Sequence, residues 1–215
     1  MYLDTANIDQ IKKYIDYDWV KGVTTNPTLI AREGKSREEV LQSILEVLGE
    51  RELFIQAAGD TKEEICADAK KILKQGDKRI KLKIAANEAG FQAMKEIKEV
   101  HPEIGIIATA IFSIEQCYIA ALAGCEWVAP YIDRMSNQGL DSEEIVSNTA
   151  QLYANLGLNT KILGASFKNT SQIIHTMLAG ADSVTIATNL LDTIMNNKLA
   201  ADSIAVFNGD AKKFG

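Results

Sequence analysis

Residues 53–73 read LFIQAAGDTKEEICADAKKIL, and this stretch contains the unit from which the chain is built. It opens with Leu53–Ala57, an apolar run of the length of a β-strand. Thr61 and Glu64 follow as a helix-start box, in which the threonine caps free amides and the glutamate reaches back. Apolar residues then recur at the spacing of one helical face: Ile65, Ala69, Ile72 and Leu73. The stretch predicts a strand, a capped turn and an amphipathic helix.

The same pattern recurs along the whole chain. Eight short apolar runs have the length of strands: Tyr2–Leu3, Gly22–Thr25, Leu53–Ala57, Ile80–Ile84, Ile104–Thr109, Glu126–Ala129, Lys161–Ala165 and Ser183–Ala187. Helix-start boxes occur between them at Asn7/Gln10, Ser36/Glu39, Thr61/Glu64, Ser113/Gln116, Asp141/Glu144 and Asn169/Gln172. Because strands alternate with helices, we expect parallel strands joined by right-handed crossovers.

Eight such units within 215 residues match the lower size limit of a closed (β/α)₈ barrel, the TIM barrel. We therefore predict an α/β fold with a single domain over residues 1–215, in which residues from about 198 to 215 form a C-terminal helical tail. An open doubly wound sheet is the structural alternative. However, the chain has neither a GxGxxG nor a GxxxxGK[ST] phosphate loop, which favours the barrel.

Composition argues against several classes of partner. The chain has 23 basic and 29 acidic residues and no basic run, so nucleic acid is not expected to bind. The three cysteines lack CxxC spacing and the two histidines are far apart, so we predict no metal and no other cofactor. We also expect no signal peptide and no membrane span, and we predict a cytoplasmic protein.

Polar residues collect where the apolar runs end. In a (β/α)₈ barrel the chemistry lies at the carboxyl ends of the strands. Reading the last residues of the runs and those just beyond gives the candidate site residues Asp4, Thr24, Asn26, Gln56, Lys83, Thr109, Tyr131, Arg134 and Ser166.

Lys83 is the most informative of these candidates. Leu82 and Ile84 flank it in a strand that we expect to be buried on both faces, where an unpaired ammonium is costly. Burial favours the neutral amine, which is the form that attacks a carbonyl group. The position therefore suits a lysine that forms a Schiff base.

Lys81 complicates this interpretation. Strand alternation places it on the same side as Lys83, about 6–7 Å away along the chain. It could act as a second cation that further favours the neutral form of Lys83, pair with a carboxylate such as Glu52 or Asp4, or be the reactive amine itself. The residues alone leave these three uses open.

Four segments, in order and at matching spacing, resemble the transaldolase family: GVTTNPT at 22–28, IKLKI at 80–84, VAPYIDR at 128–134 and ASFK at 165–168. The resemblance extends over nearly the whole chain and is strongest to the short subfamily that contains fructose-6-phosphate aldolase. It implies that Lys83 is the Schiff-base lysine. It also implies that Asp4 orients the dihydroxyacetone hydroxyls and assists proton transfer to them.

The remaining candidates receive roles from the same resemblance. Thr24 and Asn26 are implied to line the three-carbon unit, and Arg134 and Ser166 to hold the substrate phosphate. The catalytic water is assigned to a group of three residues: Gln56, Thr109 and Tyr131.

The resemblance also bears on which reaction to expect. Transaldolases in the family resemble one another in having glutamate at the position of Gln56 and phenylalanine at that of Tyr131, so this chain has the aldolase-like pair. We therefore expect a class I aldolase that cleaves or forms fructose 6-phosphate, or a similar ketose phosphate, from dihydroxyacetone and an aldehyde phosphate. The chain departs from the family pattern at Lys81, Ala85 and Asn87.

Two other functions remain open from the sequence. One is a transaldolase that moves a dihydroxyacetone unit between sugar phosphates in the pentose phosphate pathway, and the other is a non-catalytic barrel that binds sugar phosphates. The resemblance also implies a homo-oligomer, a ring of five or a pair of such rings, and Ile204, Val206 and Phe207 in the tail are apolar residues able to pack on a neighbour.

Overall fold

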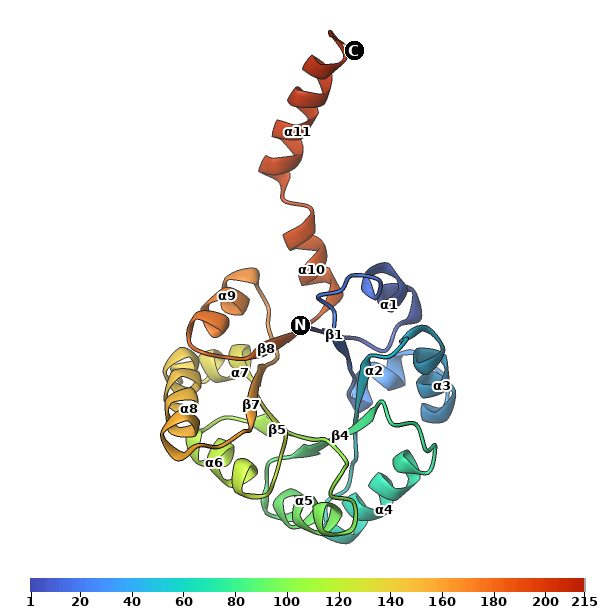
Figure 1. Ribbon diagram of the computed structural model, residues 1–215, viewed down its shortest axis with the longest axis vertical. Helices are drawn as coiled ribbons and strands as arrows, with labels where there is room; N and C mark the ends of the chain where they lie inside the picture. The colour runs from blue at the N-terminus through green and yellow to red at the C-terminus, as the bar shows by residue number, and fades with distance from the viewer. Residues whose placement is uncertain (215) are drawn as a thin grey trace.

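A computed structural model describes residues 1–214 and shows a closed barrel of eight parallel strands, each paired with the next and β8 paired with β1 (Figure 1). The strands are β1 Tyr2–Asp4, β2 Gly22–Thr24, β3 Glu52–Gln56, β4 Ile80–Ala85, β5 Ile106–Ile111, β6 Trp127–Pro130, β7 Lys161–Gly164 and β8 Ser183–Ile186. The predicted α/β (β/α)₈ barrel is confirmed, and the open sheet is wrong. Every predicted run contains a strand or overlaps one, and the largest displacement is at β5.

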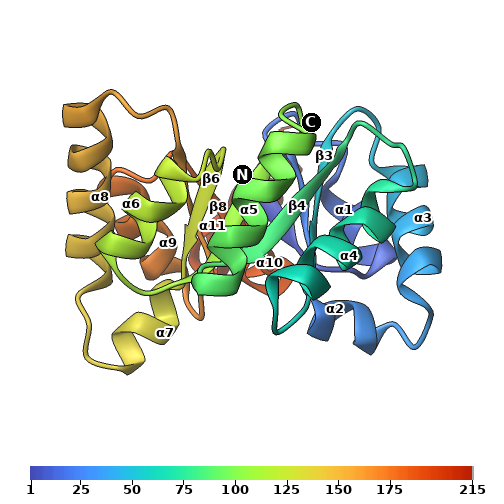
Figure 2. The same cartoon turned by 90° about the horizontal axis from the view of Figure 1, so that it is seen from below.

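Most of the helices surround the strands as an outer ring, and the last one extends away from it (Figure 1). The helices are α1 Ile8–Tyr14, α2 Pro27–Arg32, α3 Arg37–Val47, α4 Lys62–Leu73, α5 Glu88–Val100, α6 Ile114–Leu122, α7 Ile132–Asn137, α8 Ser142–Leu156, α9 Thr170–Leu178, α10 Thr188–Met195 and α11 Lys198–Ala211. Viewed from the side, α2 and α7 lie at the same end of the barrel, beyond the carboxyl ends of β2 and β6 (Figure 2).

The predicted helix starts are confirmed. All six capping side chains accept a hydrogen bond from the amide three residues later, which satisfies one of the free donors at each helix start. The reciprocal bond is also present in the boxes that begin at Ser36, Thr61 and Asn169. Asn26 and Asn87 cap α2 and α5 in the same way, although the sequence pattern did not single them out as caps.

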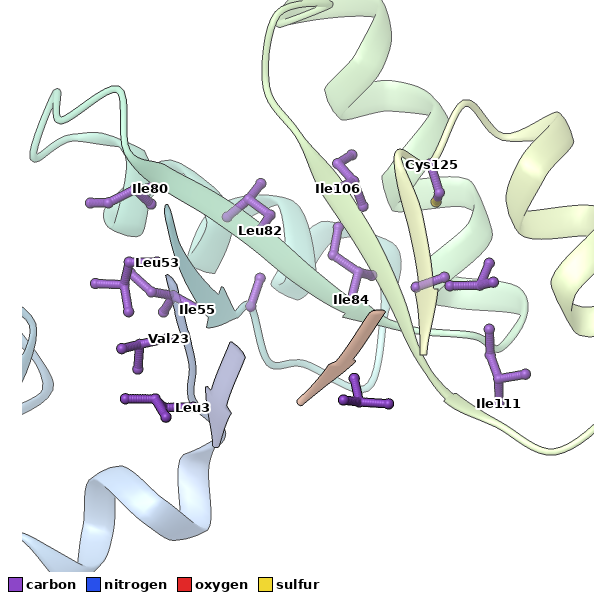
Figure 3. Packing of buried hydrophobic residues seen from close by; sticks show 14 of the residues in the cluster. Leu3, Val23, Leu53, Ile55, Ile80, Leu82, Ile84, Ile106, Ile111 and Cys125 are labelled. Carbon is purple, nitrogen blue, oxygen red and sulfur yellow. The ribbon is translucent and has the colours of Figure 1, made fainter. Parts of the chain in front are cut away.

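The larger core lies between the strands and the helices. Alternate residues of each strand point outward, so that Leu53, Ile55, Leu82 and Ile84 belong to one continuous cluster of buried side chains. Figure 3 shows these residues on neighbouring strands of the barrel wall. Their burial removes apolar surface from water and fixes the register of the strands.

A smaller core fills the inside of the barrel. Phe54, Ile107 and Leu163 alternate with outward-facing residues and are at most 1% exposed. Tyr2 and Trp127 pack edge-on against each other in the same cluster, their ring centroids 5.9 Å apart. This interior cluster separates the polar groups at the two ends of the barrel.

The chain leaves the barrel through α10 and continues as α11, which extends away from the ring (Figure 1). Every residue of α11 is exposed, including Leu199, Ile204, Val206 and Phe207. Among residues 1–214, no helix is both long and apolar enough to cross a membrane.

Candidate active site

A cavity of about 520 Å³ opens at the carboxyl ends of the strands. Seven of the nine predicted site residues line it: Asp4, Asn26, Gln56, Lys83, Tyr131, Arg134 and Ser166. The other two, Thr24 and Thr109, are each 1% exposed and hydrogen-bond to residues that line the cavity. The structure thus brings all nine to one place.

Lys83 comes from the middle of β4, and its side chain reaches the cavity. The residue is 4% exposed, and its Nζ lies 3.4 Å from the carbonyl oxygen of Thr25. Within residues 1–214 it forms no ion pair with a carboxylate. The amine thus lies at the cavity, where it could reach the carbonyl carbon of a bound ligand.

Lys81 has a different environment at the amino end of the barrel. Its Nζ lies 2.6 Å from Glu52 Oε1 and 2.7 Å from Glu126 Oε2. Burial would lower the pKa of Lys81, but its hydrogen bonds to Glu126 and Glu52 raise that pKa overall. Of the uses left open for Lys81, the structure shows pairing with a carboxylate, and it is with Glu52 rather than Asp4. Glu126 is a second partner that the sequence did not indicate.

Asp4 ends β1 beside the cavity, where its register partner is Thr24 on β2. The Thr24 hydroxyl donates to Asp4 Oδ1 at 2.9 Å. A second hydroxyl, that of Thr185 on β8, lies 2.6 Å from Thr24 Oγ1. The carboxylate is therefore held by a side chain of the neighbouring strand.

Tyr131 and Thr109 form a second polar pair on another wall of the cavity. Their hydroxyl oxygens are 2.9 Å apart. The Tyr131 ring packs edge-on against Phe112 and lies under the guanidinium of Arg134, whose Cζ is 5.0 Å from the ring centroid. These contacts fix the ring, so the tyrosine hydroxyl has a defined place from which to hold a water molecule or a substrate group.

Two residues near the cavity have left-handed backbone conformations. Ala110, next to Thr109, has φ 57°, and β5 shifts its register there. Ser166 has φ 62°, and its carbonyl oxygen accepts a hydrogen bond from the Asp133 amide at 3.0 Å. Such conformations are costly for residues other than glycine and concentrate at functional sites. The hydrogen bond from Asp133 to Ser166 joins the loop that contains Ser166 to α7, which carries Arg134.

Two neutral amide side chains, those of Asn26 and Gln56, also line the cavity. Asn26 lines the cavity and uses its side-chain oxygen to cap α2, accepting from the Leu29 amide at 3.0 Å. Gln56 is the register partner of Lys83 on the neighbouring strand and is half-buried. Both residues therefore offer neutral hydrogen-bonding groups close to the lysine.

Sequence reasoning missed several lining residues. Thr185 and Ala187 occupy inward positions at the end of β8, and Arg32 ends α2. Thr185 could have been found by applying the strand-end rule to alternate residues of the run Ser183–Ala187, since Thr185 and Ala187 share one face. Arg32 had no comparable signal. Lys168 also lines the cavity.

The cavity carries more positive than negative side chains. Arg32, Arg134 and Lys168 line it besides the amine of Lys83, together with a single acidic residue, Asp4, in a chain whose net charge is −6. An anionic ligand would find compensating cations there. Within residues 1–214, no three or more His, Cys, Asp or Glu side chains are grouped so that they could hold a metal ion.

Comparison with known proteins gives the same picture along the whole chain. The family model described as Transaldolase/Fructose-6-phosphate aldolase matches residues 1–214. A protein of Thermoplasma acidophilum named "Probable transaldolase" is 32% identical over 216 residues, which cover 99% of this chain and 95% of that protein. One of Streptococcus pneumoniae named "Probable fructose-6-phosphate aldolase" is 35% identical over 193 residues, covering 89% and 86%.

Solved structures agree with the fold at low sequence identity. A mandelate oxidase variant with an FMN adduct has a TM-score of 0.59 at 10% identity, covering 88% of this chain and 63% of its own. Flavocytochrome b2 with sulfite bound has a TM-score of 0.60 at 13% identity, covering 87% and 56%. These likenesses show the barrel alone. The family match and the relatives carry the assignment: this chain belongs to the family of enzymes that comprises the transaldolases and the fructose-6-phosphate aldolases.

Proposed function

We propose that this protein is a class I aldolase that reversibly cleaves fructose 6-phosphate, or a similar ketose phosphate, into dihydroxyacetone and an aldehyde phosphate. The observation that carries the proposal is the buried amine of Lys83. It has no carboxylate partner within residues 1–214 and lines the same cavity as Arg134 and Ser166. The amine supplies the nucleophile, and the guanidinium and hydroxyl supply the contacts that a phosphate requires.

The first half of the reaction forms and uses the Schiff base. The neutral Lys83 amine adds to the ketone carbon to give a carbinolamine, which loses water to become an iminium ion. The positive nitrogen draws electrons from the neighbouring carbon–carbon bond. The hydroxyl on the far carbon of that bond gives its proton to Asp4, the bond breaks, and an aldehyde departs while the electron pair remains as an enamine.

The second half decides between cleavage and transfer. In an aldolase the enamine carbon takes a proton from a water molecule, and hydrolysis of the resulting iminium returns dihydroxyacetone and the free amine. We assign this water to Tyr131 and Thr109, whose hydroxyl oxygens are 2.9 Å apart, and to the neutral Gln56. Thr24 and Asn26 position the three-carbon unit in this scheme.

The transaldolase reaction is the second candidate, because relatives of this chain carry both names. The two activities are separated by incubating the enzyme with fructose 6-phosphate, with and without erythrose 4-phosphate as acceptor. We expect glyceraldehyde 3-phosphate to be released without the acceptor. Release that strictly requires erythrose 4-phosphate would reverse the order of the two candidates.

Trapping with borohydride tests the Schiff base itself. Reduction in the presence of dihydroxyacetone should attach the three-carbon unit to Lys83, which peptide mapping by mass spectrometry locates. Lys81→Met is the matched control, because it removes the other inward lysine of β4 and should still give the adduct. An adduct on Lys81 would refute the assignment, and no adduct at all would favour a barrel that only binds sugar phosphates.

We further propose a homo-oligomer, since α11 exposes Leu199, Ile204, Val206 and Phe207 without covering them on its own barrel. A pentamer or decamer is expected from the family resemblance. We also propose that the chain is a single barrel domain with a helical tail from about residue 198. We propose a cytoplasmic location for it. Light scattering of the full chain and of residues 1–197 would give the number of chains in each particle. The same number in both would contradict a role for α11 in assembly.

A further inference from the structure

Thr185 stands out among the residues that the proposed reaction has not used. It occupies an inward position of β8, is 3% exposed and lines the cavity. Its neighbours Val184 and Ile186 belong to the outer core. Valine has nearly the same shape as threonine and is favoured in buried strands, so packing alone gives no reason for a hydroxyl at this position.

The Thr185 hydroxyl belongs to a hydrogen-bonded chain of three side chains from three adjacent strands. Thr185 Oγ1 lies 2.6 Å from Thr24 Oγ1, and Thr24 Oγ1 lies 2.9 Å from Asp4 Oδ1. The three strands β8, β1 and β2 are neighbours because the barrel closes there. The chain of bonds therefore exists only in the folded barrel.

The direction of the two bonds follows from the number of protons available. An ionised carboxylate can only accept, so Thr24 must donate its single proton to Asp4 Oδ1. The oxygen of Thr24 then acts as the acceptor for Thr185, which donates. Each hydroxyl thus has one role, and the negative charge of Asp4 orients the whole chain.

We infer that Thr185 is a positioning residue for the proposed reaction, holding the Thr24 hydroxyl in the orientation that anchors Oδ1 of Asp4. With Oδ1 anchored, Oδ2 is the oxygen left to take the proton of the substrate hydroxyl. The inference rests on the proposed function, because it assigns Asp4 a proton-transfer role. It extends the functional site to β8, from which no site residue was predicted.

Loss of the Thr185 hydroxyl should affect turnover more than binding. Without it, the Thr24 hydroxyl loses the donor that fixes it, and the carboxylate samples orientations that do not suit proton transfer. Substrate contacts made by Lys83, Arg134 and Ser166 are untouched. The expected change is therefore in kcat, with KM nearly constant.

Three variants separate positioning from packing. Thr185→Val should lower kcat about tenfold, the factor that one ordinary hydrogen bond represents, and change KM by less than about twofold. Thr185→Ser keeps the hydroxyl and should recover most of the lost kcat. Thr176→Val is the matched control: Thr176 is 1% exposed, lies on α9, and its hydroxyl has no hydrogen-bond partner within residues 1–214.

A double variant tests whether Thr185 acts through Asp4. In an Asp4→Asn enzyme, which should already turn over slowly, adding Thr185→Val should cause little further fall in kcat. Unchanged kcat in Thr185→Val, no recovery in Thr185→Ser, or a full tenfold fall in the Asp4→Asn background would each overturn the inference. Should the valine variant not fold, Thr185→Ala removes the same hydroxyl.

Failure of the inference can be distinguished from failure of the proposed function. If the wild-type protein forms no borohydride adduct with dihydroxyacetone and releases no aldehyde from fructose 6-phosphate, the function itself is wrong. If the wild type does both and Thr185→Val matches it in kcat and in KM, only the role of Thr185 is wrong.

Discussion

Lys81 and Lys83 lie two residues apart on β4 and point into the same barrel, but the two ends of the barrel give them different partners. At the amino end, Lys81 is held between Glu52 and Glu126, and its pKa is raised. At the carboxyl end, Lys83 is buried with a backbone carbonyl oxygen nearby and no carboxylate partner within residues 1–214. The two lysines thus differ in their charged partners more than in their burial.

The largest effect is expected from Lys83→Met. The rate of aldehyde release should fall by about 10⁴ or more, because the nucleophile of the proposed reaction is gone. Stability should be unchanged or slightly higher, since methionine replaces a buried amine that forms no ion pair. Kinetics and urea denaturation measure the two quantities. Retained activity would show that the two lysines are not divided in the way described.

Lys81→Met should show the reverse pattern. Its removal leaves Glu52 and Glu126 without their shared cation, and the free energy of unfolding should drop by about 1–3 kcal/mol. The borohydride adduct on Lys83 should still form. A triple variant that also carries Glu52→Gln and Glu126→Gln should recover much of the loss in urea denaturation, because the two negative charges are then gone. An equally unstable triple variant would point to lost packing rather than lost pairing.

Substituting Gln56 by glutamate would place a carboxylate beside Lys83 at the carboxyl end of the barrel. β3 presents Glu52 inward at the amino end of the barrel and Gln56 at the carboxyl end, where Gln56 is the register partner of Lys83. Gln56→Glu combined with Tyr131→Phe should shift the ratio of transfer to cleavage about tenfold toward transfer, since the proposed protonating water loses Tyr131. Parallel assays with and without erythrose 4-phosphate give the ratio. Each single variant serves as a control, and an unchanged ratio in the double variant would show that this pair does not decide the outcome.

The smallest effect concerns alkaline pH. A raised pKa in the folded state means that the Lys81 pair stabilises the protein fully below the ordinary lysine pKa of about 10.4, and that this contribution is lost as pH rises through the folded pKa. The stability difference between wild type and Lys81→Met should therefore shrink at high pH. Urea denaturation between pH 7 and 11 measures it. A difference that grows with pH would have the wrong sign.

Tyr2, at the amino end of the barrel, also makes the stability fall as pH rises. Burial and its hydrogen bond to Glu52 raise the pKa of the Tyr2 phenol, whose oxygen donates to Glu52 Oε2 at 2.7 Å. Its contribution is present below the ordinary tyrosine pKa of about 10 and is likewise lost as pH rises. A Tyr2→Phe variant is thus the control that separates the two groups.

The elements of the fold could be predicted because their signals are local. A run such as Leu53–Ala57 and a box such as Thr61/Glu64 act within a few residues, and both produced the expected strand and helix start. The general position of the site also followed, because the strand-end rule needs only the chain order. All nine candidates consequently lie in or beside one cavity.

The missed features depend on which strands become neighbours. Thr185 meets Thr24 only because β8 closes on β1, and Glu126 reaches Lys81 across the β4–β5–β6 wall. Gly105 shows how close this approach is, since a Cβ there would lie 2.6 Å from the Lys81 side chain and 2.5 Å from that of Glu126. The left-handed backbone of Ala110, at the register shift of β5, and that of Ser166 could not be predicted either, because neither residue is a glycine.

The interior cluster of Phe54, Ile107 and Leu163 fills the barrel below the cavity, so the cavity opens only at the carboxyl end. Every molecule that reaches Lys83 must arrive and depart on the same side. The first aldehyde therefore has to leave before an acceptor can take its place, which predicts a ping-pong order for any transfer reaction. In the proposed reaction, water and an acceptor would therefore reach the enamine through the same opening.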